Sequence, residues 1–186
     1  YSFIPDEFKG DARAGDVWID QETAALMTPG QEGYYVLLHE LAHALGLQHP
    51  LTEADTSGAT VLLNTFNSIN NTVMLDVSAV SVGSSWPTWF GSFDLQALRY
   101  LYGTRAYASG NDTYTVKDAT SNMTIIDDGG MDTLDASTVS VSVSIDLRGG
   151  KSSSIGMDTD GTSKFNNVAI AAGSLIENVM GSPYDD

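Results

Sequence analysis

The sequence predicts an α+β fold in which a mainly helical first part is followed by a part built from short strands. Two stretches before Gly103 carry apolar residues at helical spacing, with leucines three or four positions apart. After Gly103 this spacing disappears, and short apolar pieces alternate with turns rich in Gly, Asn and Asp. We therefore expect two domains, residues 1–103 and residues 104–186.

The composition permits a packed core and argues against several kinds of partner. Of the 186 residues 42% are hydrophobic, and no stretch is apolar for long enough to be inserted in a membrane. The formal net charge of −16 argues against nucleic acid and anionic membranes as partners. The acidic excess is either a solvated surface or a set of cation ligands, and its clustering with Gly and Asn late in the chain favours calcium for part of it. There are no cysteines, so cysteine usage leaves the compartment open.

The first helical stretch carries the most specific motif in the chain. Residues 39–50 read HELAHALGLQHP, which has the spacing HExxHxxGxxH. Because positions four apart share a helix face, His39 and His43 can bind one metal ion. Gly46 allows the left-handed turn that returns the chain, so that His49 becomes the third ligand. Three histidine ligands with an open fourth position are typical of catalytic zinc, whereas a closed set of four is typical of structural zinc.

Glu40 follows the first ligand directly, so its carboxylate can lie beside the metal without binding it. A short HExxH also occurs by chance on ordinary helices, and a single histidine is more often packed or solvated than bound to metal. The longer pattern, with Gly46 and a third histidine, is far more restrictive, and these are the only 3 histidines in the chain. We therefore expect a catalytic zinc site with Glu40 as the general base.

Further elements are expected around this motif. The stretch Thr28-Pro29-Gly30-Gln31 is a candidate start for the zinc helix, and Ser92 is a candidate N-cap for a second helix that ends at Gly103. Strands are expected at residues 113–116, 123–126, 139–147 and 168–171. The turns GNDT (110–113) and DDGGMDT (127–133) are similar to the nonapeptide calcium repeat, and ordinary β-turns with acidic tips are the alternative.

The chain as a whole resembles the serralysins, bacterial secreted zinc metalloproteases with a metzincin catalytic domain and a calcium-binding β-roll. The resemblance rests on YSFIPDEFKG, DVWID, HELAHALGLQHP, FDLQALRYLYG, DDGGMDTLDAS and VAIAAGSLIENVMG. It implies that residues 1–103 are the C-terminal part of a metzincin catalytic domain, with an edge strand, the zinc helix, a Met-turn and a closing helix. Residues 104–186 would be the start of a calcium-binding β-roll or β-sandwich domain. The protein would be a secreted, extracellular endopeptidase.

The resemblance also assigns roles to individual residues. The implied zinc ligands are His39, His43 and His49, with Glu40 as the catalytic base and Met74 as the Met-turn residue beneath the metal. The implied calcium ligands are Asp127, Gly129, Gly130, Asp132 and Glu177, with Arg105 and Gly110 as further carbonyl donors. The substrate-side edge strand falls on Tyr1, Ser2, Phe3 and Ile4, along which an extended peptide would add as a further strand.

Three differences from the family pattern stand out. Asp76 lies two residues after Met74, where family members usually carry a Tyr whose hydroxyl can bind zinc and stabilise the oxyanion. A carboxylate can bind zinc, but when ionised it donates no hydrogen bond, so we expect slower turnover. The upstream half of the catalytic sheet is missing, as are most of the β-roll and the export segment. Because a half-sheet leaves an open edge and apolar surface, we expect a second polypeptide to supply the missing strands.

The activity expected from these residues is metal-assisted hydrolysis of peptide bonds. Zinc would polarise the scissile carbonyl, and Glu40 would move a proton from water to the leaving amine. The alternative is a zinc- and calcium-bound scaffold or interaction module with little proteolysis, which Asp76 and the incomplete sheet favour. The intact motif favours the enzyme, because a scaffold has no need for Glu40.

Overall fold

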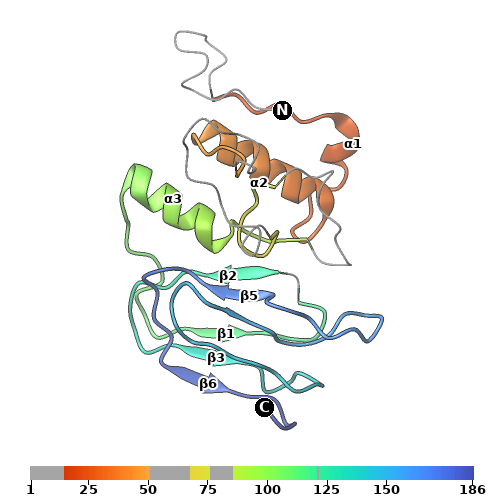
Figure 1. Cartoon of the computed structure of the whole chain (residues 1–186), viewed down its shortest axis with the longest axis vertical. Helices are drawn as coiled ribbons and strands as arrows, with labels where there is room; N and C mark the ends of the chain where they lie inside the picture. The colour runs from red at the N-terminus through yellow and green to blue at the C-terminus, as the bar shows by residue number, and fades with distance from the viewer. Residues whose placement is uncertain (1–14, 51–67, 76–85, 121) are drawn as a thin grey trace.

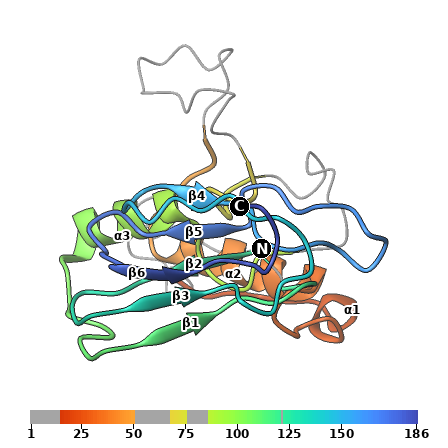
Figure 2. The same ribbon diagram turned by 90° about the horizontal axis from the view of Figure 1, so that it is seen from below.

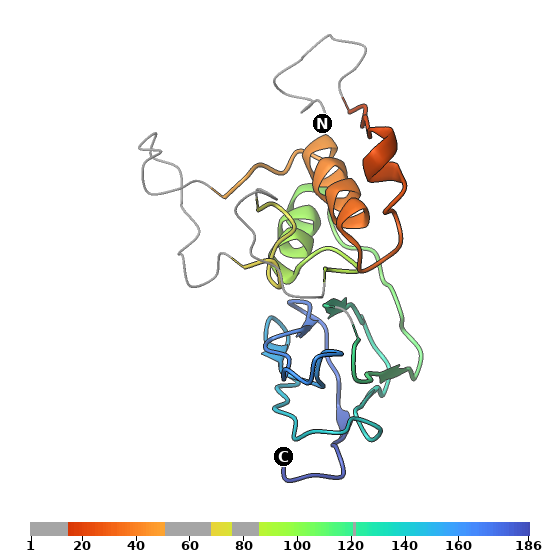
Figure 3. The same ribbon diagram turned by 90° about the vertical axis from the view of Figure 1, so that its right-hand side faces the viewer.

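The computed structural model describes residues 15–50, 68–75, 86–120 and 122–186. Within these residues three helices precede six short strands along the chain, so the protein is a mixed α/β protein with small sheets. Helices α2 (Glu32–Ala44) and α3 (Ser92–Tyr102) lie together on one side of the strands (Figures 1 and 3). Among the described residues, no helix is both long enough and apolar enough to cross a membrane.

A short helix and a longer one open the described part of the chain. Helix α1 (Gln21–Ala24) is capped by Asp20, whose carboxylate accepts a hydrogen bond from the Thr23 N–H at 2.8 Å. Helix α2 begins at Glu32 and not at residues 28–31, because Gly30 has a φ of +86°, which no right-handed helix contains. At Gly33 a Cβ atom would collide with the backbone of the α1 region, so glycine permits this close approach.

Helix α3 starts one residue earlier than a Ser92 cap would require. Its N-cap is Gly91, and Ser92 is the first helical residue. The Asp94 carboxylate reaches back and accepts a hydrogen bond from the Gly91 N–H at 2.9 Å, which satisfies a donor that the helix itself cannot. Helices α2 and α3 share one apolar cluster, whose buried members are Tyr35, Leu38, Ala42, Leu47, Val73, Met74, Phe90, Leu95 and Ala171.

The strands form two small sheets between which the chain alternates. One sheet has the order β1 (Thr113–Thr115), β3 (Thr133–Asp135), β6 (Asn178–Met180), and both of its pairings are parallel. The other has the order β2 (Met123–Ile125), β5 (Val168–Ile170), β4 (Ser152–Ser153), with β2 and β5 parallel and β4 antiparallel. Figure 2 shows β4 and β5 on one side of this arrangement and β1 and β3 on the other.

A second apolar cluster fills the space between the two sheets. Leu134 of β3 and Ile125 and Ile170 of β2 and β5 are nearly inaccessible to solvent, with exposed fractions of 0%, 2% and 1%. The expected strands at 113–116, 123–126 and 168–171 are confirmed to within one residue. Parallel strands that alternate between two sheets around such a core are compatible with a β-roll.

The strand expected at residues 139–147 was wrong. Its alternating apolar residues do pack on the second cluster, because Val139 and Val143 are buried there. Its backbone, however, is satisfied mainly by side chains: the Val143 N–H donates to Asp186 and the Asp146 N–H donates to Ser153 Oγ. Among the described residues, one isolated β-bridge, between Ser144 and Ser154, pairs this segment with another part of the chain. The alternation therefore predicted the burial correctly and the pairing incorrectly.

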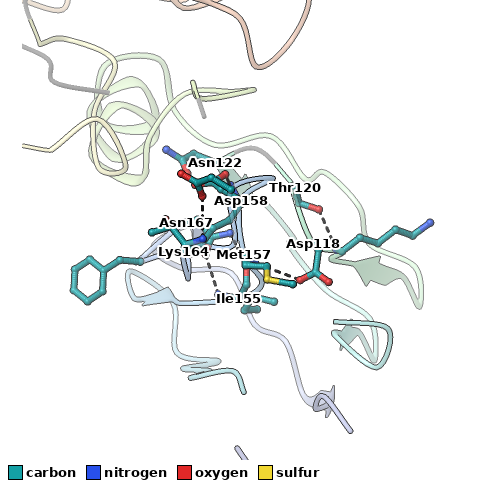
Figure 4. A network of polar contacts seen from close by, with 12 residues as sticks. Asp118, Thr120, Asn122, Ile155, Met157, Asp158, Lys164 and Asn167 are labelled. Carbon is teal, nitrogen blue, oxygen red and sulfur yellow. Dashed lines mark hydrogen bonds and ion pairs between the residues drawn. The ribbon is translucent and has the colours of Figure 1, made fainter. Parts of the chain in front are cut away.

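A network of polar contacts lies within the strand region, around Lys164 and Asn122 (Figure 4). Lys164 is buried, with a side chain only 3% exposed, and its ammonium group lies 2.6 Å from the Asp158 carboxylate. Such an ion pair offsets the desolvation of the amine. Nearby, the Asn122 side chain donates to Asn70 Oδ1 at 2.6 Å, and the Asn122 carbonyl accepts from the Thr88 N–H. Asn122 thus ties the strands to the segment around Asn70 and to the loop before α3.

Candidate metal centres

Helix α2 and the turn that follows it bring the three histidines together. His39 and His43 lie one turn apart on α2, with ring centroids 4.7 Å apart. The helix ends at Ala44, and Gly46 has a φ of +90°, which confirms the expected left-handed turn. The Gly46 N–H donates to the His43 carbonyl and the Leu47 N–H to the Ala42 carbonyl, the two bonds of a Schellman motif. This turn carries His49 back to the other two rings.

The three imidazoles point the same kind of nitrogen at one another. His49 Nε2 lies 3.0 Å from His39 Nε2 and 3.1 Å from His43 Nε2. His39 Nδ1 lies 2.7 Å from the Val73 carbonyl and His43 Nδ1 lies 2.9 Å from the Leu47 carbonyl. A carbonyl only accepts hydrogen bonds, so both Nδ1 atoms carry the proton, and both Nε2 atoms present lone pairs when the rings are neutral.

Converging lone pairs repel one another unless a cation lies between them. At a zinc–nitrogen distance of about 2.0–2.1 Å, tetrahedral ligand atoms are roughly 3.3 Å apart, which is close to the observed separations. Burial lowers the pKa of His39, and hydrogen bonding to the Val73 carbonyl opposes this. The neutral, metal-binding form of His39 is therefore favoured. The donor set fits a zinc ion, and Glu40 lies half-buried on α2 beside the first ligand.

The turn that contains Met74 is joined to the histidine-bearing helix. Met74 is 2% exposed and packs in the same apolar cluster as α2. The turn that contains it is fixed to α2 at two points, since the Val73 carbonyl accepts from His39 and the Leu75 carbonyl accepts from the Tyr35 hydroxyl at 2.8 Å. Met74 thus shares an apolar cluster with the histidine-bearing helix, and its role as the Met-turn residue stays a prediction.

Asp94 holds this turn from the opposite side. Its carboxylate accepts hydrogen bonds from the Thr72 hydroxyl at 2.6 Å and the Val73 N–H at 2.7 Å, in addition to the bond from Gly91. Burial raises the pKa of Asp94, and these hydrogen bonds oppose the rise. Asp94 therefore positions the Val73 peptide, whose carbonyl in turn orients the His39 ring. The sequence reasoning did not find this residue, although an acidic side chain in a first helical turn is a recognisable capping pattern.

Replacing Asp94 with Asn should destabilise the fold and weaken zinc binding together. An amide places an NH₂ group opposite N–H donors, so at least one buried donor loses its acceptor, at a cost of about 1–3 kcal/mol. Urea denaturation and a competitive zinc titration measure the two effects. The exposed Gln96 on the same helix provides a matched control, Gln96→Ala, for which neither quantity should change. Unchanged zinc affinity in the Asp94 variant would contradict the positioning role.

Replacing Gly46 with Ala should strain the turn before His49. A Cβ at this position meets no atom within 4 Å, so the cost arises from the left-handed backbone alone, about 1–2 kcal/mol. Gly46→Asn should be milder, because asparagine adopts this conformation more readily. Urea denaturation of the two variants checks this order. Equal losses would show that the left-handed conformation is not the reason for glycine here.

A second group of metal-ligand type lies in the strand region. Carboxylate oxygens of Asp112, Asp127 and Asp132 all lie within 4.8 Å of one another, and Asp127 and Asp132 are completely buried. The Glu177 carboxylate joins them by accepting a hydrogen bond from the Asp132 N–H at 2.8 Å. Gly129 donates to Asp127, and Gly130 approaches the Gly110 carbonyl so closely that a Cβ would collide with it.

The electrostatics of this acidic cluster are unfavourable without a cation. The hydrogen bond from the Asp112 N–H lowers the pKa of Asp132, but burial and the charges of Asp127 and Glu177 outweigh it, so the pKa is raised overall. Burial and the hydrogen bond to Asp127 likewise raise the pKa of the Tyr114 hydroxyl. Asp132 Oδ2 is buried and has no hydrogen-bond partner among the described residues. A buried orphan oxygen among carboxylates fits calcium, which takes six to eight oxygen ligands.

The structure brings together most of the residues that the sequence singled out. Asp112 was not predicted as a ligand, although it lies in the GNDT turn at residues 110–113. Arg105 lines a cavity together with Arg99 and Tyr107, and its expected role as a carbonyl donor stays a prediction. The expected edge strand at Tyr1, Ser2, Phe3 and Ile4, and the position Asp76, lie outside the described residues.

Comparison with known proteins identifies the family. Residues 94–186, half of the chain, match the family model described as the C-terminal region of the peptidase M10 serralysins. The chain belongs to the serralysin family. All of this serralysin-family chain aligns with Serralysin C of Dickeya chrysanthemi at 28% identity and with Serralysin of Proteus mirabilis at 30%. It aligns over its whole length with Serralysin G of Dickeya chrysanthemi at 29% identity.

The serralysin-family chain spans only part of these relatives. It covers 42% of the length of each of the three. The matched family model begins at Asp94, inside α3, and covers the acidic cluster but not the histidines. The division into a catalytic domain at 1–103 and a calcium-binding domain at 104–186 stays a prediction, as do the roles of the individual ligands.

Proposed function

We propose that this chain is part of a zinc-dependent endopeptidase of the metzincin type, with Glu40 as its general base. The observation that carries the proposal is the convergence of three Nε2 atoms at 3.0–3.1 Å, with the Nδ1 atoms of His39 and His43 held by backbone carbonyls. A structural zinc site would have a fourth protein ligand, whereas the cluster of described metal-ligand residues here contains three.

His39, His43 and His49 would hold the metal, and the remaining residues of the site would act around it. A bound zinc ion would supply Lewis acidity for a peptide carbonyl and for water. The Val73 and Leu47 carbonyls fix the tautomer and orientation of two imidazoles. Hydrogen-bond acceptors at the other ring nitrogen have this role for metal-binding histidines generally. Glu40 takes a proton from water at its carboxylate and delivers it to the leaving amine. An extended substrate would lie along residues 1–4.

The acidic cluster would serve as a structural calcium site. Asp127 and Asp132 supply the buried carboxylates, Asp112 and Glu177 lie beside them, and Gly110, Gly129 and Gly130 surround them. Calcium would offset the mutual repulsion of these groups and would fix the turns that precede β1, β3 and β6. Arg105 would contribute through its backbone carbonyl.

Hydrolysis of a quenched fluorescent peptide or of casein tests the proposal. We expect cleavage in millimolar calcium that stops with a zinc chelator and returns when zinc is added back. Absence of cleavage by protein shown to contain zinc by elemental analysis would favour the scaffold or interaction module, which Asp76 supports because it replaces the usual Tyr. The assay is run on the chain alone and again with the upstream segment of a relative added.

Secretion and a second polypeptide complete the proposal. The family matches support an extracellular setting for the activity. We also propose a second polypeptide as a partner that packs against the helical part and contributes strands to a shared sheet. Native mass spectrometry of the purified protein is the measurement. A folded, active monomer of this chain alone would remove the second polypeptide from the proposal.

A further inference from the structure

A cavity of about 510 Å³ lies where the helical layer meets the strands, and it adjoins the acidic cluster through Tyr114, whose hydroxyl donates to Asp127. Its walls are formed by the loop before α3, by α3 itself, by the segment after it and by strands β1 and β2. The volume lies in the range of about 300–1,000 Å³ that is usual for ligand sites. Neither the histidines nor the three clustered aspartates line it.

The charge of this cavity is opposite to that of the molecule. The chain has a formal net charge of −16 and only 8 basic residues, yet two of the eight, Arg99 and Arg105, line this cavity. Arg99 is engaged, since it binds the Asp128 carboxylate at 2.9 Å and the Ala172 carbonyl at 3.1 Å. The exposed Arg105 guanidinium has no hydrogen-bond or ion-pair partner among the described residues. A carboxylate is its natural ligand, because a guanidinium binds a carboxylate through two parallel hydrogen bonds.

The rest of the wall is apolar and aromatic. Trp89 and Tyr107 line the cavity although their exposed fractions are 44% and 66%, and Met123 and Ile125 of β2 complete the apolar surface. Large aromatic side chains with this exposure supply contact area at a low cost in conformational entropy when a partner covers them. The cavity therefore suits an apolar group attached to a carboxylate.

Strand β2, which forms one wall, is also an edge strand of its described sheet. It pairs with β5, and β5 pairs with β4 on its other side. The Met123 N–H donates to Asn167 and the Ile125 carbonyl accepts from Ala171, both on the β5 side. Because backbone groups alternate in direction along a strand, the N–H and carbonyl of Thr124 are directed away from β5. An extended peptide can form hydrogen bonds to such an edge, and a fatty acid cannot use both groups.

We propose that this cavity binds the C-terminal end of an extended apolar peptide. The α-carboxylate binds Arg105, an apolar side chain lies among Trp89, Tyr107 and Met123, and the peptide backbone follows the Thr124 edge of β2. The site is independent of zinc chemistry. Its ligand class is a peptide with a free carboxylate and a large apolar last residue.

Isothermal titration calorimetry with the synthetic peptide Ala-Val-Leu-Phe tests this proposal. The full chain carrying Glu40→Gln is used in calcium buffer, so that the probe is not cleaved and the outcome does not depend on hydrolysis. We expect the free acid to bind and the C-terminal amide to bind at least tenfold more weakly. Arg105→Ala should cause the same loss for the free acid. Lys117→Ala removes another exposed cation of the strand region, outside the cavity, and should leave the affinity unchanged.

Three results would overturn the proposal. The first is no binding of the free acid by protein that circular dichroism shows to be folded. The second is equal affinity for the acid and the amide, or an Arg105→Ala variant that binds like the parent. The third is decanoate binding more tightly than the peptide with the same dependence on Arg105, which would assign the cavity to a fatty acid. Arg105 is exposed, so its replacement is not expected to affect folding.

Discussion

Replacing Glu40 with Gln should abolish peptide hydrolysis and leave zinc bound. Gln is nearly isosteric with Glu but cannot accept and return a proton at neutral pH, and general acid–base catalysis contributes about 10²- to 10⁴-fold to the rate. His39, His43 and His49 supply all the nitrogen ligands of the described cluster, so zinc affinity should change little. The fall should appear in kcat rather than in KM, because substrate binding does not require the proton transfer.

The matched control for Glu40→Gln is Glu32→Gln, which removes an exposed carboxylate from the first turn of the same helix. This variant should keep full activity, and both variants should retain the stoichiometry of zinc found by elemental analysis. A Glu40 variant that hydrolyses peptides at the parental rate would contradict the assignment of the base. A variant that loses zinc as well as activity would show that Glu40 supports the metal, and kinetics could then no longer identify a proton carrier.

The histidine cluster could be predicted from sequence because its geometry is almost entirely local. His39 and His43 are set by helical periodicity, and His49 is set by one glycine with φ of +90° and the two hydrogen bonds of the following turn. Local spacing also predicted the burial of the strand residues. It failed for the start of α2, where Gly30 breaks the helix, and for residues 139–147, whose pairing depends on partners distant in the sequence.

The other interactions of the two centres could not be predicted in the same way, because they join distant segments. Asp94 reaches the Val73 peptide 21 residues earlier, and Glu177 reaches the Asp132 peptide 45 residues earlier. Asp112 and Asp132 meet only because β1 and β3 pair in parallel, with Thr113 opposite Thr133. The register of two short strands carries little information in a single sequence. A motif therefore predicted the ligand types, and the sheet topology decided which acidic residues cluster.

Replacing Asp132 with Asn should remove most of the stabilisation that calcium provides. In calcium the parent should be stabilised by about 2.7 kcal/mol when the ion is at a hundredfold excess over its Kd. For a chain of this size that corresponds to a rise in Tm of about 5–11 °C. The variant should lose most of this rise, because an amide is a weaker calcium ligand than a carboxylate and carries no charge. Thermal unfolding with calcium and with a chelator measures both values.

The sign of the stability change that Asp132→Asn causes without calcium distinguishes a calcium ligand from an aspartate that only holds the turns by hydrogen bonds. Asp132 Oδ2 is a buried oxygen without a hydrogen-bond partner, and it lies among the carboxylates of Asp127 and Asp112. An amide NH₂ at that position can donate to one of these carboxylates and removes one of the clustered negative charges. The variant should therefore be as stable as the parent in chelator, or more stable, and less stable in calcium. Asp160→Asn changes an exposed aspartate of another turn and should shift neither curve. A loss of stability for Asp132→Asn that is equal in chelator and in calcium would mean that the acidic cluster holds the turns by its own hydrogen bonds, without an ion.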